Sequence, residues 1–268
     1  MIYPDLQPFA MVSLTKGFLF GPMNTEISEA IIMRVKECGE SDLLVTFFTP
    51  GRGVLKGLAK AGRKSRRRFV NCFGSFSLVS LEYVIKKERD LAFLHSGRLI
   101  AGYPGLRTDF SLMSRASFMI ELTQVLFPSG VSDPRMFELL ERCLARLEAE
   151  GLSDLILLLF EARAMTLGGY EINLGKCALC GRPYQGEGMA VFQTEKGGIA
   201  CMKCELASPF HPLMGPAGVR FLGRLQEGFL SEEKAQEPPD EALGQIRNVL
   251  KLHREYRLER GLRTSRYL

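Results

Sequence analysis

The chain has 268 residues with 46% hydrophobic and 24% charged side chains, which is ordinary for a globular protein and leaves room for one large domain or two modest ones. Its longest strongly apolar run, residues 155–160, is far too short to span a bilayer. Asp5, Lys16 and the lack of a small-residue cleavage site argue against a signal peptide. The net charge is +5. We therefore expect a cytoplasmic protein.

The first elements in chain order predict an extension and then a β-barrel. Residues 1–25 have no clear period and are expected to be a poorly ordered extension, and Met23 resembles a natural start, so residues 1–22 are a candidate overlong gene assignment. Five short β-prone runs separated by turns follow at 31–35, 43–49, 54–59, 76–85 and 91–94. Five strands in so short a segment predict an OB-fold, the commonest five-stranded barrel that binds nucleic acid, over residues 26–102.

The positive charge is concentrated in the middle of this predicted barrel. Between Gly51 and Leu81 there are eight basic residues and no acidic one, and removing these eight from the 35 Lys and Arg leaves 27 basic against 30 acidic residues elsewhere. A solvated charged face is the ordinary explanation of a charge run, but eight against zero favours a surface for a polyanion. The predicted DNA-binding residues are Arg52, Lys56, Lys60, Arg63, Lys64, Arg66, Arg67 and Arg68.

After residue 102 the pattern becomes helical. Residues 110–127 are apolar at helical spacing and end before Pro128, and Asp133-Pro134 is typical of a helix cap followed by the first helical residue. Ser153 is predicted to cap a third helix that is apolar on all sides, as expected at the centre of a bundle. The helical pattern resumes at Pro216, and a final helix is expected from about 240 to 261. The fold class is thus α+β, with an OB-fold barrel followed by a helical domain at 103–268.

Four cysteines interrupt the helical domain and form the strongest motif of the chain. Cys177 and Cys180 form one C-x-x-C pair, Cys201 and Cys204 form another, and 20 residues separate Cys180 from Cys201. This spacing is typical of one structural Zn2+ held by four thiolates, in a closed site with no open position for substrate. Disulfides and inert thiols are the alternatives. We predict a zinc module at 175–206, whose reduced thiols also favour the cytosol.

Three isolated cysteines and the histidines have ordinary interpretations. Cys38, Cys72 and Cys143 are each expected to be small buried hydrophobic residues. His253 with Glu255 forms an H-x-E motif of the kind used by zinc deaminases, but it follows the cysteines instead of preceding them, so a buried structural histidine is expected. The segment from Gly57 to Ser65 misses the P-loop pattern because Arg63 stands where the motif needs Lys. No catalytic residues are predicted, and the chain is not expected to be an enzyme.

Several stretches, in order, resemble the family of the bacterial DNA repair protein RecO, a recombination mediator. In the barrel these are Gly-Glu-Ser-Asp at 39–42, Thr-Pro-Gly-Arg-Gly at 49–53 and Ala-Lys-Ala-Gly-Arg-Lys at 59–64. Further along they are Phe-Glu-Ala-Arg at 160–163, Gly-Gly-Tyr at 168–170, Cys-Ala-Leu-Cys-Gly at 177–181, Glu-Lys-Gly-Gly-Ile-Ala-Cys at 195–201 and the ending Leu-Arg-Thr-Ser-Arg-Tyr-Leu at 262–268. The resemblance covers about residues 28–268. One departure is Ala61, where the family usually has Gly.

The resemblance implies a function without catalysis. RecO-like proteins bind single- and double-stranded DNA, anneal complementary strands, and with RecR help to load the recombinase RecA onto strands coated by single-strand-binding protein (SSB). It also implies a cytoplasmic, nucleoid-associated protein and a contact with the acidic C-terminal tail of SSB. The last helix offers an apolar pocket with a cationic rim for that tail, and its predicted partner-binding residues are Arg247, Lys251, Arg254 and Arg257.

Two other classes of function remain as alternatives. A zinc-ribbon RNA- or ribosome-associated binding protein without annealing activity would also have a basic barrel and a zinc module. A zinc-dependent enzyme would need an open metal position, which the four-thiolate pattern denies.

Overall fold

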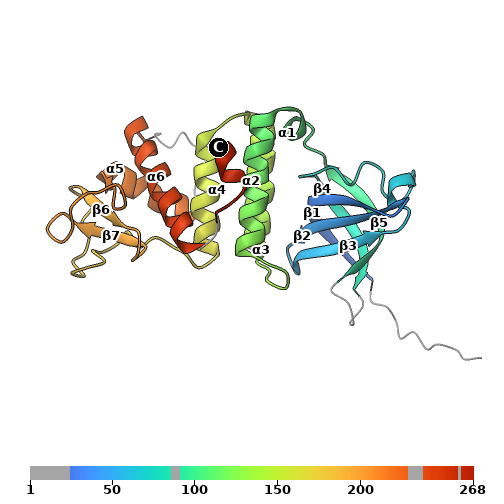
Figure 1. The fold of residues 1–268 in the computed structure, drawn as a ribbon, viewed down its shortest axis with the longest axis horizontal. Helices are drawn as coiled ribbons and strands as arrows, with labels where there is room; N and C mark the ends of the chain where they lie inside the picture. Colours follow the sequence, from blue (N-terminus) through green and yellow to red (C-terminus); the bar gives the residue numbers. More distant parts are fainter. Residues whose placement is uncertain (1–24, 86–90, 229–237, 259–260) are drawn as a thin grey trace, which may run out of the picture.

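The computed structural model describes residues 25–85, 91–228, 238–258 and 261–268. Figure 1 shows three parts in a row: a barrel at one end, a layer of helices in the middle, and a small sheet at the other end. The extension predicted over 1–25 lies, apart from Thr25, outside the described residues. Within the described ranges, no helix combines the length and the apolar content needed to cross a membrane.

The N-terminal part is a closed five-stranded barrel with strand order β1-β2-β3-β5-β4. Its strands are β1 (Glu26–Cys38), β2 (Asp42–Thr49), β3 (Gly53–Ala59), β4 (Leu78–Ile85) and β5 (Ala92–Ala101). The strand β4 pairs back onto β1, and β3 pairs with β5 in parallel, which closes the barrel. This confirms the predicted OB-fold barrel.

The strand ends differ from those predicted. β1 begins at Glu26 and not at residue 31, and β5 continues to Ala101 and not only to residue 94. Both extensions are held by backbone pairing with β4, in which Glu26 lies opposite Tyr83 and Leu99 opposite Val79. The apolar pattern did not predict these ends because their side chains are mostly exposed or half-buried.

The barrel is buried on two sides, against its own interior and against the helices. Ala30 and Ile32 of β1 belong to the barrel interior, whereas Ile31 and Met33 pack into the core shared with the helices. Phe48 of β2 stacks on Phe137 of the helical part, with ring centroids 6.1 Å apart. Because successive side chains of a strand point to opposite faces, one run of four buried residues serves both cores.

The helical part contains six α-helices in the described residues: α1 (Gly105–Thr108), α2 (Phe110–Leu126), α3 (Pro134–Glu150), α4 (Asp154–Leu167), α5 (Pro216–Glu227) and α6 (Asp240–Arg257). The predicted caps are confirmed, since the Asp133 side chain accepts from the Arg135 N–H and the Ser153 side chain from the Ile156 N–H. The helix α4 contacts α2, α3, α5 and α6, which is the central position predicted for it. The last helix ends at Arg257, four residues before the predicted end.

A short sheet lies at the far end of the helices, on the left in Figure 1. It consists of β6 (Ala190–Gln193), β7 (Gly198–Cys201) and β8 (Leu213–Met214) in the order β7-β6-β8. Phe192, Ile199 and Met214 of this sheet are buried in the same core as the helices. The sheet positions the four cysteines.

Candidate nucleic-acid interface and metal centre

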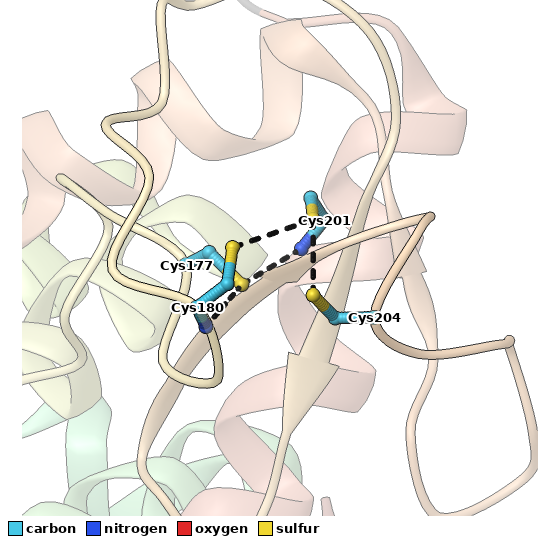
Figure 2. A group of neighbouring side chains, drawn as sticks. All are labelled: Cys177, Cys180, Cys201 and Cys204. Atoms are coloured by element: carbon cyan, nitrogen blue, oxygen red, sulfur yellow. Dashed lines mark hydrogen bonds between the residues drawn. The ribbon is translucent and has the colours of Figure 1, made fainter.

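The four cysteines meet at one point, as Figure 2 shows. Their sulfur atoms all lie within 4.8 Å of one another. Two turns create this arrangement. In the first, the Cys177 N–H donates to the carbonyl of Arg182 (2.8 Å) and Gly181 takes a φ of 74°, a left-handed conformation that glycine adopts without strain. In the second, β7 ends at Cys201, and the Cys204 N–H donates to the Cys201 carbonyl at 2.9 Å.

The distances fit a tetrahedral metal centre. Zinc–sulfur bonds of about 2.3 Å in a tetrahedron place the sulfur atoms about 3.8 Å apart. The Cys180 and Cys201 Sγ atoms are 3.9 Å apart, and those of Cys201 and Cys204 are 3.5 Å apart. A disulfide would bring two sulfurs to about 2.05 Å, so the four residues are thiols here. The cluster can hold a metal ion and is consistent with structural zinc.

The backbone around Cys177 favours the thiolate form that binds metal, whereas hydrogen bonds with the Cys201 and Cys180 sulfurs raise the pKa of the Cys204 thiol to about 12. Burial raises the pKa of the Cys177 thiol, but backbone N–H groups of Cys180, Cys201 and Leu179 outweigh it and lower the pKa to about 6. Two of these bonds reach the Cys177 Sγ, at 3.5 Å from the Cys180 N and 3.3 Å from the Cys201 N (Figure 2). No histidine or carboxylate joins this cluster in the part of the chain that the structure describes.

The other cysteines divide into two buried residues and one exposed residue. Cys72 and Cys143 are buried, as predicted. Cys38 is exposed, so the prediction that it is a buried hydrophobic residue is wrong. The reason is that β1 runs beyond the barrel core, and its last residues pair with β2 without any element packing over them.

The connection between β3 and β4 carries most of the predicted DNA-binding residues and has two sides. Phe69 and Cys72 are buried in the barrel interior, so this side closes one end of the barrel. The cationic side is exposed and includes Lys60, Arg63, Lys64 and Arg66–Arg68. A hydrogen bond of 2.7 Å from the Gly97 N–H to the Arg68 carbonyl ties the connection to β5.

Ala61, the position at which the sequence departs from the resembled family, has a left-handed backbone conformation. It has a φ of 51°, in the left-handed region where a residue with a Cβ is strained and glycine is not. Its N–H donates to the Asp42 carboxylate at 2.7 Å, which holds the turn despite the strain.

The eight predicted cations are not equivalent. Arg52 forms an ion pair with Glu26, and Arg63 forms one with Glu37 at 3.0 Å. Arg68 lies over the Phe69 ring and donates to the Lys60 carbonyl. The other five cations are exposed and have no ion pair to any described residue. They are Lys56, Lys60, Lys64, Arg66 and Arg67. These five are the cations most accessible to phosphate groups.

The predicted partner-binding residues of α6 lie beside a cleft of about 610 Å³. Arg247 and Lys251 are exposed at it, with Arg247 paired to Asp154 at 2.6 Å. Arg254 differs from what was expected of a rim cation: it is buried, pairs with the equally buried Glu161, and lies over the Phe118 ring. Arg257 does not line the cleft and donates to the Glu195 carbonyl at 3.2 Å. Sequence reasoning missed Arg115, Arg266 and Leu268, which also line the cleft.

His253 is a buried structural histidine, as predicted. It is 1% exposed, its Nε2 lies 2.8 Å from the Tyr170 carbonyl oxygen, and burial lowers its pKa. It packs edge-on against Phe192 of the small sheet.

Comparison with known proteins identifies the family. The sequence model for "Recombination protein O N terminal" matches residues 23–103, and that for "Recombination protein O C terminal" matches residues 107–266. The chain belongs to the recombination protein O (RecO) family. It is 31% identical over 245 residues to the DNA repair protein RecO of Desulfatibacillum aliphaticivorans, covering 90% of this chain and 95% of that protein. It is also 32% identical over 238 residues to the RecO of Anaeromyxobacter sp. strain K, covering 89% and 93%.

Membership of the RecO family assigns this chain a role in DNA repair and recombination. Its members are DNA repair mediators. Family membership also disfavours the RNA- or ribosome-associated alternative.

Proposed function

We propose that this protein binds single- and double-stranded DNA through the β3–β4 connection and the neighbouring Lys56 of β3, and anneals complementary strands coated with SSB. With RecR it would help to load RecA. The observation that carries the proposal is the set of five exposed cations without ion pairs, Lys56, Lys60, Lys64, Arg66 and Arg67. Each cation that neutralises a phosphate releases condensed counterions, which drives binding to any DNA sequence.

Annealing follows from the same charges. Two complementary strands repel each other through their phosphates, and a cationic surface that binds both lowers this repulsion. No group on the protein has to make or break a covalent bond. The sites therefore need charge and exposure, which the connection provides, and no general acid or base.

The partner contacts are assigned to the cleft beside α6. An acidic peptide such as the SSB tail would meet Lys251 and Arg266, with Leu157 and Leu158 as apolar contacts, whereas Arg115 is already paired with Asp154 at 2.9 Å. Arg254 takes part as a buried support for the cleft and not as a rim cation, since its charge is paired with Glu161. Zinc, held by the four cysteines, has a structural role in this proposal, and we assign it no step in annealing.

The first test is annealing of complementary oligonucleotides coated with SSB, with and without this protein, at two salt concentrations. Acceleration that weakens at high salt is expected. Binding to bare strands without annealing would keep the DNA-binding surface and overturn the mediator function. Stronger binding to RNA than to DNA of the same length would favour the RNA-associated alternative.

The second test reverses two of the free charges. Arg66→Glu with Arg67→Glu should weaken binding to every DNA sequence and reduce the salt slope of log K by about 2, since each lost phosphate contact removes about one unit. The matched control is Arg142→Glu with Arg220→Glu, which changes the same charge on two exposed residues of the helical part. A wild-type salt slope in the first variant would contradict the proposal.

A further inference from the structure

A groove of about 930 Å³ lies beneath the cationic connection. It is lined on the barrel side by residues of the β3–β4 connection, including Arg66, Val70 and Phe73, and on the helical side by Gly102, Pro104 and Arg107. Its volume is at the top of the range of about 300–1,000 Å³ typical of ligand pockets. The groove is therefore large enough for a planar ring system such as a nucleic-acid base.

The charges around the groove have one sign. Its lining contains Arg63, Arg66 and Arg107 and no Asp or Glu among the described residues. Arg66 has no ion pair there, and the Glu37 that pairs with Arg63 does not line the groove. Arg107 Nη1 donates to the Ser75 carbonyl at 3.0 Å and to the Gly102 carbonyl, so it joins the two sides of the groove. The site is suited to an anion.

Apolar surface lies among these cations. Phe73 is half-buried, and its ring is supported by the buried Phe69, with centroids 4.9 Å apart. Val70 is 50% exposed, while Cys72, two residues later, is fully buried in the barrel. Asn71 between them has a φ of 55°, and this left-handed turn lets the chain bury Cys72 while Val70 stays in the groove. A half-exposed aromatic ring beside cations is the combination that single-stranded nucleic acids recognise.

We infer that this groove binds the bases of a single strand while the strand's phosphates contact the exposed cations of the connection. The inference rests on the proposed function and adds to it the strand type that the site prefers. A duplex cannot use the groove, because its bases are already stacked and paired inside the helix. The connection would thus bind all DNA through charge, and the groove would add affinity for single strands alone.

One loop of the usual nucleic-acid face of an OB-fold is acidic here, and the other, residues 86–90, lies outside the described residues. Such folds bind through strands 2–3 and the loops that follow strands 1 and 4. In this protein the loop after β1 contains the exposed Glu40 and is flanked by Glu37 and Asp42, which would repel phosphate. Glu37 and Asp42 contact the β3–β4 connection through Arg63 and the Ala61 N–H, but neither carboxylate lines the groove, and the strand is expected there.

The inference is tested with three probes: a 15-nucleotide oligothymidine, an abasic strand with the same number of phosphates, and a 15-base-pair duplex. Wild-type protein should bind the oligothymidine more tightly than the abasic strand. Phe73→Leu keeps apolar packing and removes the ring, so affinity for oligothymidine should fall about fivefold or more, the lower end of about 1–3 kcal/mol for one stacked base. Affinities for the abasic strand and the duplex should not change.

A variant that is expected to raise affinity keeps the inference testable even if Phe73→Leu fails to fold. Val70→Tyr places a second ring in the groove at a half-exposed position and should raise affinity for oligothymidine only. The matched control is Phe210→Ala, which removes an aromatic ring that is 73% exposed and lies in the loop before β8. It should leave all three affinities unchanged. Thermal unfolding of each variant verifies that the barrel is intact.

The outcomes separate the two proposals. If wild type binds none of the three probes, the proposed DNA-binding function fails and the inference fails with it. If wild type binds all three equally and neither Phe73→Leu nor Val70→Tyr changes the preference, DNA binding stands and the groove is overturned. A fall in duplex affinity equal to the fall for oligothymidine would also overturn it.

Discussion

The barrel and the zinc module lie at opposite ends of the molecule (Figure 1) and are stabilised in different ways. The barrel closes on itself, so its five strands all have backbone partners, and its interior contains fully buried side chains such as Val45, Phe47 and Leu81. The sheet at the other end has strands of four, four and two residues, and its buried side chains pack into the core of the helices. Among the described residues, this sheet has no hydrophobic cluster separate from that of the helices.

This difference in stabilisation goes with a difference in the role of the two parts. A small module cannot bury enough apolar surface to be stable alone and needs a metal or a neighbour. The zinc module has both, a four-cysteine cluster and the packing of Phe192 against the helices. The barrel has an interior core of its own besides its contact with the helices, and its surface is free to carry the unpaired cations that the proposed function uses. Four predictions test this division.

The largest effect is expected from removing the metal ligands. Cys177→Ala, or a zinc chelator, should unfold residues 175–206 locally, because structural zinc contributes about 10–16 kcal/mol in model fingers at neutral pH. Hydrogen exchange measured by mass spectrometry should show lost protection there and unchanged protection in the barrel. The control is Cys38→Ala, which removes an exposed thiol outside the cluster. Loss of protection in both ends would mean that the two ends do not fold separately.

The packed contact between the barrel and the helices, here called the joint, should be destabilised when a buried side chain there loses volume. Phe48→Ala removes a fully buried ring that stacks on Phe137, and should lower the free energy of unfolding by about 3–5 kcal/mol. Urea unfolding with and without chelator measures this cost. We expect the same cost in both conditions, because the joint is far from the cysteines. A cost that depends on zinc would contradict the independence of the two ends.

Arg254 and Glu161 form a buried ion pair between α6 and α4. Removing one partner should lower the free energy of unfolding more than removing both. Arg254→Met leaves the Glu161 carboxylate buried and unpaired, which should cost about 3–5 kcal/mol in urea unfolding. Adding Glu161→Leu should recover much of that loss, since two apolar side chains then replace two charges. A double variant as unstable as the single one would show that the pair is needed for the packing of α4 against α6.

The smallest effect concerns pH and the C-terminal segment. Burial raises the pKa of Glu121, but hydrogen bonds from the Thr264 hydroxyl and the Arg263 and Thr264 N–H groups outweigh it, so the pKa is lowered. A carboxyl with a lowered pKa in the folded state stabilises the protein above its unfolded pKa of about 4.3, and this contribution is lost as the pH falls through the folded value. Unfolding measured between pH 6 and 3 should therefore depend less on pH in Glu121→Gln. Equal pH dependence in both proteins would contradict this assignment.

Much of the fold followed from local patterns. The caps at Asp133 and Ser153, the helix stop before Pro128 and the metal spacing of the cysteines are all set by residues a few positions apart, so the sequence predicts them directly. The strand ends were less predictable. Glu26 is a strand residue because Tyr83 lies opposite it, and nothing in its own neighbourhood indicates this.

The sequence by itself determined the barrel strands, the main helices, the four cysteines of the candidate metal centre and the segment that carries the excess charge, but not the small sheet β6–β8. Only the tertiary structure decided which charges are free. Arg52 is paired with a carboxylate 26 positions away, and Arg254 is buried against one 93 positions away, whereas Arg66 and Arg67 remain exposed and have no ion pair to a described residue. The groove beneath the connection also exists only in the folded chain. The physical reason is that cap and ligand spacing depend on local backbone geometry, whereas ion pairing and burial depend on contacts between distant residues that form only on folding.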